Sequence, residues 1–178
     1  TINCFDTSTT CDNYFETKAE KEIKEHRSEV IEKLVEFSFT DVILFWSAND
    51  DIKSLQTEKW LPVLKWLNNR FKITLKETDG LTPPPQNENN RAGFTEILEK
   101  MSLKTLTAYY LAAVRLKSPL LALALAEKKI TASEAFELAY LEELYQSKSW
   151  GVDEEAEQGR QCVKNELLEI EEFLHGKK

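Results

Sequence analysis

Apolar residues recur at helical spacing in several stretches of the chain. The pattern runs from Glu16 to Phe37 among many lysines and glutamates, from Met101 to Leu116, and from Val163 to Leu174, where the opposite face is acidic. A period near 3.6 is typical of an amphipathic helix that buries one face. Each of the three stretches is therefore predicted to be a helix.

Two further helices are predicted from their start signals. Ser118 can cap a helix with Pro119 in its first turn, and the leucines that follow occupy nearly every side of it. Thr131 followed three residues later by Glu134 is a capping box, which opens a helix to about Ser147. The first of these helices is apolar all round and belongs in the core.

The region between these helices gives weaker signals. Phe39–Ala48 is rich in aromatic and β-branched residues and fits either a strand or a buried helical continuation, of which we favour the helix. Pro62 is tolerated in a first helical turn, so a helix is predicted to begin there with Leu61 as a poor N-cap. Phe71–Leu75 alternates and predicts a short strand, whereas the proline-rich stretch Thr82–Asn90 predicts a loop.

Together these elements predict a mainly α protein, an antiparallel bundle-like domain of about five to six helices with at most a short β element. The length of 178 residues suits one domain. We assign residues 16–178 to the helical domain and residues 1–15 to an N-terminal extension or linker.

The charge pattern narrows the class of partner. The formal net charge is -8, and the basic residues are spread along the chain without forming a stripe that would follow a phosphate backbone. The longest uncharged apolar stretch, Ser118–Ala126, is about half of the roughly 20 residues that cross a bilayer. We expect neither a nucleic-acid partner nor a membrane span.

Candidate catalytic chemistry is sparse. His26 and His175 are the only histidines, and no nucleophile-elbow, phosphate-loop or dinucleotide glycine pattern occurs. Cys4, Cys11 and Cys162 lack C-x-x-C spacing, which indicates neither a disulfide framework nor a zinc site and favours a reducing compartment. We expect no enzyme activity, no metal or cofactor, and no small-molecule substrate.

One carboxylate breaks the local pattern. If the helix that begins at Thr131 continues without a break, Glu142 lies in the same apolar arc as Leu138 and Tyr145. A buried carboxylate is costly unless it is paired, so Glu142 either forms an internal salt bridge or faces a cleft that a partner enters. The four tryptophans, Trp46, Trp60, Trp66 and Trp150, add large amphipathic surface for a core or an interface.

Several elements, in order, resemble one known family. They are a Thr-Asp pair before an apolar aromatic run (Thr40–Phe45), Gln56 with a Trp-x-Pro-x-x-x-Trp element (Trp60–Trp66), Lys117-Ser118, a Leu-Glu-Glu-x-Tyr-Gln element (Leu141–Gln146) and Trp150-Gly151. The chain is similar in these positions to the mitochondrial and alphaproteobacterial assembly chaperones that bind the alpha subunit of the ATP synthase F1 head. It departs from them at Leu61, where they have aspartate, and at Glu157-Gln158, where many have a His-Asp pair.

The resemblance implies a non-catalytic chaperone that binds the unassembled alpha subunit before the beta subunit arrives, in the mitochondrial matrix or in the cytoplasm of a related bacterium. It also implies that the family's β-rich N-terminal domain is absent from this chain. The expected partner-binding residues are Glu142, Trp150, Gln146, Trp60, Trp66 and Asp41. Two alternatives remain open, a generic helical adaptor and a small enzyme that uses Glu142 and Asp41 as an acid-base pair.

Overall fold

The computed structural model describes residues 20–79, 82 and 87–176, and the predicted extension at residues 1–15 lies outside these ranges. The described part is mainly α, as predicted, with nine α-helices and one 3-10 helix. The elements in chain order are α2 (Glu20–Glu25), α3 (Arg27–Ser38), the 3-10 helix η2 (Val42–Leu44), α4 (Asp50–Phe71), α5 (Glu88–Glu99), α6 (Leu103–Leu116), α7 (Pro119–Ala126), α8 (Ala132–Ala139), α9 (Leu141–Trp150) and α10 (Glu154–His175).

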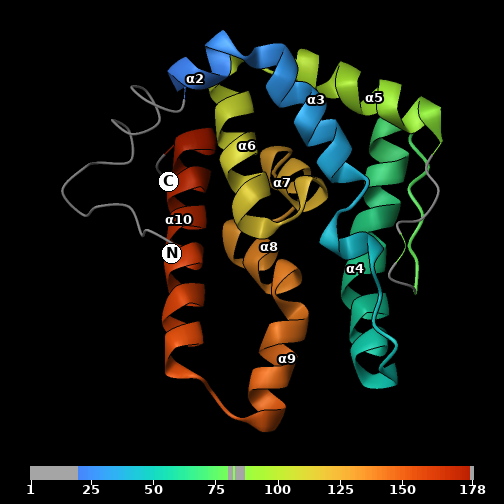
Figure 1. The fold of residues 1–178 in the computed structure, drawn as a ribbon, viewed down its shortest axis with the longest axis vertical. Helices are drawn as coiled ribbons and strands as arrows, with labels where there is room; N and C mark the ends of the chain where they lie inside the picture. The colour runs from blue at the N-terminus through green and yellow to red at the C-terminus, as the bar shows by residue number, and fades with distance from the viewer. Residues whose placement is uncertain (1–19, 80–81, 83–86, 177–178) are drawn as a thin grey trace.

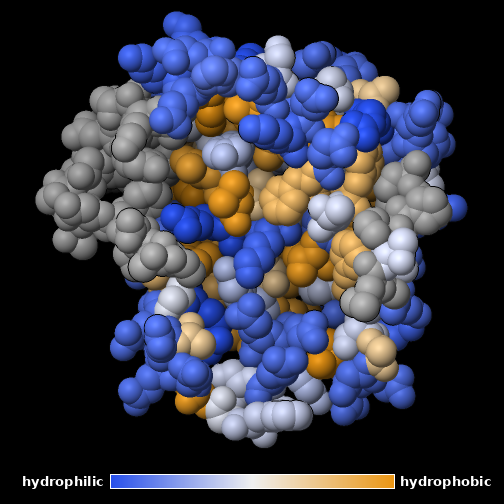
Figure 2. Space-filling view, viewed as in Figure 1, coloured by the Kyte–Doolittle hydropathy of each residue, from blue (hydrophilic) through white to orange (hydrophobic). Residues whose placement is uncertain are grey.

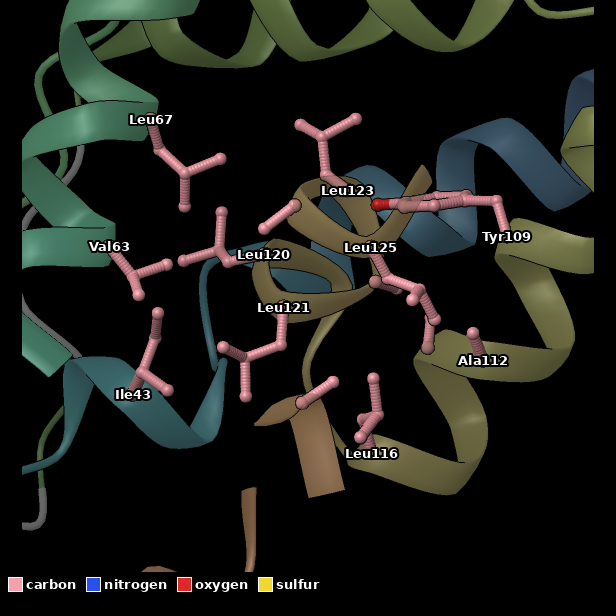
Figure 3. Close-up of a cluster of buried hydrophobic side chains, with 14 of the residues drawn as sticks. Ile43, Val63, Leu67, Tyr109, Ala112, Leu116, Leu120, Leu121, Leu123 and Leu125 are labelled. Carbon is pink, nitrogen blue, oxygen red and sulfur yellow. The ribbon is translucent and has the colours of Figure 1, made fainter. Parts of the chain in front are cut away.

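The short helix α7 lies at the centre of the fold and the other helices pack around it (Figure 1). All of its residues except Ala126 are buried. Ile43, Val63 and Leu67 approach α7 from one side, and Tyr109 and Leu116 of α6 from another (Figure 3). A helix that is apolar on every side can be stable in water only if it is surrounded in this way, so the composition of α7 determines its place.

The predicted helix starts in the second half are confirmed. The Ser118 side chain accepts a hydrogen bond from the Leu121 amide at 3.0 Å, and Pro119 occupies the first turn of α7. The capping box at α8 is complete, because the Thr131 amide also donates to the Glu134 carboxylate at 2.7 Å. These bonds satisfy amides that a helix start otherwise leaves without partners.

The start of α4 was predicted wrongly. The helix begins at Asp50, because the side chain of Asn49 caps it by accepting from the amides of Asp51 and Ile52. Pro62 therefore lies inside the helix, and Leu61 is not its N-cap. A proline inside a helix leaves one carbonyl without its amide partner, and here Pro62 is exposed, so water can hydrate that carbonyl.

The segment Phe39–Ala48 is neither a strand nor a continuous helix. Its centre forms η2, which Asp41 caps by accepting from the Ile43 amide at 3.0 Å. Beyond η2 the chain is extended and forms one isolated parallel bridge between Phe45 and Thr78. The predicted helix is wrong because tertiary bonds to Asp41 and Thr78 replace local helical ones.

Phe71–Leu75 alternates in burial, but in the described ranges it has no neighbouring strand, so the predicted short strand is not formed. Phe71 ends α4, and two asparagine side chains take the place of a strand beyond it. The Asn90 amide group binds both the N–H and the C=O of Thr74, at 2.9 and 2.7 Å. Asn68 does the same for Leu75, at 2.9 and 3.3 Å. Each carboxamide supplies the donor and acceptor of a sheet partner, which satisfies this extended backbone without a sheet.

The helices are shorter and more numerous than predicted. The first predicted helix is interrupted at His26, and the helix from Thr131 is interrupted at Tyr140. The predicted loop Thr82–Asn90 also ends early, since Glu88 already lies in α5. No helix in the described ranges has the length and apolar character needed to span a bilayer.

The cysteine prediction is wrong at one position. Cys162, on α10, is disulfide-bonded.

Candidate protein-binding site

Helix α9 carries several of the predicted partner-binding residues, and most of its surface is exposed. Leu141 is its one buried residue. Glu142, Gln146 and Trp150 are all exposed and lie four residues apart, so they share one face of the helix. The structure thus brings three of the six predicted partner-binding residues onto one surface.

The expected burial of Glu142 is wrong. The chain leaves helical geometry at Tyr140 (φ -102°, ψ 17°), so Glu142 does not continue the angular register of α8. Tyr140 stacks on Phe136 with ring centroids 5.0 Å apart, and its hydroxyl donates to the Arg115 carbonyl at 3.2 Å. Glu142 instead lies exposed in the first turn of α9, where a negative charge complements the helix dipole.

A buried carboxylate does occur, at Asp41. One of its oxygens accepts from the Ser118 hydroxyl at 2.7 Å, and the other accepts from the Leu120 amide at 2.8 Å, at the start of α7. Burial raises the pKa of Asp41 to about 7, against the lowering effect of these hydrogen bonds. Asp41 therefore holds the η2 segment against α7 and has no exposed surface for a partner to contact.

Glu166 is the second buried carboxylate, and it pairs with Arg115 of α6. Burial raises the pKa of Glu166, and the nearby Arg115 guanidinium opposes that rise. The pair links α6 to α10. The internal salt bridge that was considered for Glu142 is therefore made by Glu166, 24 residues later in the chain.

Trp150 marks the end of α9, and its side chain lies in solvent with 89% of its surface exposed. Gly151 follows with φ 105°, a conformation that residues with a Cβ rarely adopt. Beneath this turn Arg160 is buried and bridges the two helices, at 2.8 Å from Glu157 on α10 and 3.9 Å from Glu143 on α9. A hollow of about 370 Å³ lies between Trp150 and Arg160.

On another side of α9 an open groove of about 750 Å³ separates it from α4, α8 and α10. Its apolar lining comes from Leu55, Ile130, Phe136, Leu138, Leu141 and Leu144. Its polar lining is mixed in charge, with lysines and glutamates from all four helices. The groove joins an apolar floor to a charged rim, as protein interfaces commonly do.

The remaining predicted residues lie behind or away from these surfaces. Trp60 is buried in α4, and its indole N–H donates to the Leu138 carbonyl at 2.8 Å, next to the groove floor. Trp66 is half-buried, packs edge-on to Phe71 and has the Lys129 ammonium 5.9 Å from its ring centroid. Trp60 supports the groove from inside the fold, and Trp66 lies outside its lining.

Sequence reasoning missed the groove itself. In the sequence, Leu55 and Leu144 are each consistent with ordinary helix packing. They line one groove because α4 and α9 meet, with the Tyr145 hydroxyl of α9 3.3 Å from a carboxylate oxygen of Asp51 in α4. Tyr145 and Asp51 are 94 residues apart in the chain, and nothing local couples them.

The sequence model of the family described as "ATP12 chaperone protein" matches residues 5–68. The fold matches the crystal structure of Atp12 from Paracoccus denitrificans with a TM-score of 0.87 and 24% identity, over 92% of this chain and 71% of that chain. The chain is thus similar to ATP12 chaperones in part of its sequence and in its fold. A structure of a mutant of the same Paracoccus protein matches with a TM-score of 0.85 and 25% identity, over 90% of this chain and 69% of that chain.

A third structure, from Agrobacterium tumefaciens and described as a candidate chaperone, matches with a TM-score of 0.80 and 29% identity. It covers 90% of this chain and 62% of that chain. The matched family and the Agrobacterium structure are described as chaperones, and the surfaces on either side of α9 are the exposed candidates for a protein contact in this chain.

Proposed function

We propose that this chain binds the unassembled alpha subunit of the ATP synthase F1 head and prevents its aggregation before the beta subunit arrives. The observation that carries the proposal is the exposed face of α9, where Glu142, Gln146 and Trp150 align in a chain that is similar to ATP12 chaperones. The client follows from the resemblance of the sequence elements to chaperones of the alpha subunit.

The physical requirement for such a chaperone matches the described surface. A ring subunit without its neighbours exposes apolar interface that aggregates, and a protein that covers it must also release it. The groove beside α9 offers an apolar floor for affinity, while its charged rim stays hydrated. Such a mixed surface favours binding that can later be reversed by the beta subunit.

The enzyme alternative required Glu142 and Asp41 to face a common pocket. Asp41 is fully buried with both oxygens engaged in hydrogen bonds, whereas Glu142 is exposed on α9. This geometry opposes an acid-base pair of these two residues. The helical adaptor unrelated to ATP synthase remains the competing function.

The test is co-expression of the chain with the F1 alpha subunit or the F1 beta subunit, each also expressed alone as a control. We expect the alpha subunit to become more soluble and to co-purify with the chain, and the beta subunit to do neither. Capture of neither subunit would favour the adaptor. Equal capture of both would contradict selectivity for the alpha subunit.

The proposed location is the mitochondrial matrix, with the cytoplasm of a related bacterium as the alternative. Fractionation of source cells with an antibody against the chain checks it. The chain should co-fractionate with unassembled F1 subunits.

A further inference from the structure

The turn between α9 and α10 displays its apolar side chains to solvent. Among the described residues, Trp150 and Val152 are the most exposed large hydrophobics, at 89% and 63%. They flank Gly151, and we call the three residues the α9–α10 tip. In Figure 1 the tip lies at the lower end of the molecule, far from the central helix α7.

The tip is held in one conformation by its own hydrogen bonds. The Gly151 amide donates to the Ser147 carbonyl at 3.1 Å, which ends α9. Asp153 caps α10 by accepting from the Ala156 amide at 3.1 Å. With Arg160 bridging the two helices below, the backbone that carries the indole is already ordered, so binding costs little backbone conformational entropy.

The surroundings of the tip are predominantly acidic, with Lys148 in the last turn of α9 as an exposed basic residue. The start of α10 carries Asp153, Glu154, Glu155 and Glu157, and Glu143 lies on the neighbouring side of α9, all exposed. Arg160, the basic residue of the hollow beside Trp150, is only 7% exposed and already paired. Figure 2 shows the lower end of the same view as mostly blue to white, with the orange surface concentrated over the centre.

We propose that the α9–α10 tip is an aromatic anchor that inserts into an apolar pocket bordered by lysine or arginine on the unassembled alpha subunit. This inference rests on the proposed function. Tryptophan is the side chain most often found to dominate binding energy when it fills a pocket. The carboxylates around the tip attract a basic rim and steer the encounter, and they disfavour an anionic lipid surface.

The first measurement is the affinity of purified chain for the alpha subunit. Trp150→Ala is expected to weaken binding by at least about tenfold, and Trp150→Phe by less, because a ring remains. Leu168→Ala removes a 41%-exposed leucine from the middle of α10 and serves as the matched control. All three variants should unfold at the wild-type temperature, since the altered side chains are largely in solvent.

The outcomes separate this inference from the proposed function. If the wild type does not bind the alpha subunit, both fall. If the wild type binds and Trp150→Ala binds equally well, the anchor is wrong and the function stands. Wild-type binding to phosphatidylcholine vesicles that is lost in Trp150→Ala would assign the tip to a membrane and would also overturn the anchor.

Two further readouts test the mechanism directly. The difference in emission between the wild type and Trp150→Phe isolates this indole, and adding the alpha subunit should shift it to shorter wavelength and protect it from acrylamide. Glu154→Lys with Glu155→Lys should slow association and weaken its dependence on salt. An indole that stays equally quenched in the complex would contradict insertion.

Discussion

Helix α7 and helix α9 represent two opposite uses of a short helix in the same chain. Every residue of α7 except Ala126 is buried, whereas in α9 Leu141 alone is buried. Packing around α7 dominates the burial of apolar side chains, whereas α9 buries one residue and leaves most of its surface exposed. Substitutions in the two helices should therefore separate the free energy of unfolding from client capture.

The largest effect is expected in α7. Leu121 is fully buried, and Leu121→Ala removes its packing in the core of Figure 3. Such a change costs about 2 to 5 kcal/mol, because it loses transfer free energy and leaves a cavity. Denaturant unfolding measures it, and client capture should fall only as the folded fraction falls. A cost below about 0.5 kcal/mol would show that α7 is not the stabilising centre.

Asp41 connects α7 to the η2 segment, and replacing it tests how the stability of this region depends on pH. In Asp41→Asn the new side-chain NH2 group faces the Leu120 amide, which then lacks an acceptor. The free energy of unfolding should fall by about 1 to 3 kcal/mol near pH 5. The pKa of Asp41 rises from 3.8 to about 7 on folding, so the folded state binds the proton more tightly between these values. The stability that this group contributes is complete below about pH 4 and is lost as the pH rises through about 7.

The measurement is thermal unfolding of both proteins across the pH range. The stability gap between the wild type and Asp41→Asn should shrink from about pH 5 to about pH 8, because only the wild type loses stability through this group. Ser118→Ala provides a control that removes a neighbouring donor and leaves the carboxyl able to titrate. A stability gap that widens as the pH rises would mean that the hydrogen bonds to the ionised Asp41 carboxylate outweigh the cost of burying its charge.

Gly151 controls how the α9–α10 tip is presented. Gly151→Ala meets no neighbouring atom but places a Cβ on a residue with φ 105°, which costs roughly 1 kcal/mol or relaxes the turn. Binding of the alpha subunit should fall by more than the loss of stability explains, because the direction of Trp150 changes. Gly159→Ala, inside α10 with free space around it, is the matched control. Equal capture by both variants would show that the turn geometry does not matter.

Sequence reasoning succeeded where the deciding chemistry is local. Ser118 and the Thr131 capping box marked two helix starts correctly, because each cap bonds amides within three residues. It failed at Asn49 because Pro62 offered a stronger but misleading start signal. It could not foresee that Asn68 and Asn90 replace a strand partner for Thr74 and Leu75, since that bonding depends on the tertiary placement of α4 and α5.

At the candidate site, too, the sequence predicted the local feature and missed the one that involves a distant part of the chain. The helix end predicted at about Ser147 lies three residues before the observed end of α9 at Trp150. The apolar position assigned to Glu142 assumed an uninterrupted helix, whereas the chain breaks at Tyr140, whose hydroxyl donates to the carbonyl of Arg115 in α6, 25 residues earlier. No glycine or proline marks that break, so the pattern alone placed Glu142 on the wrong face.

The smallest expected change in stability is at Glu142. Because the carboxylate is exposed at the start of α9, Glu142→Gln should change the free energy of unfolding by no more than about 0.5 kcal/mol. Loss of a charge at a contact should still weaken capture of the alpha subunit, and Glu22→Gln, exposed in the first turn of α2, gives the matched control. Denaturant unfolding and co-purification on the same preparations distinguish the two effects. Wild-type stability with wild-type capture would remove Glu142 from the interface and leave Trp150 and Gln146 as the residues of α9 that bind.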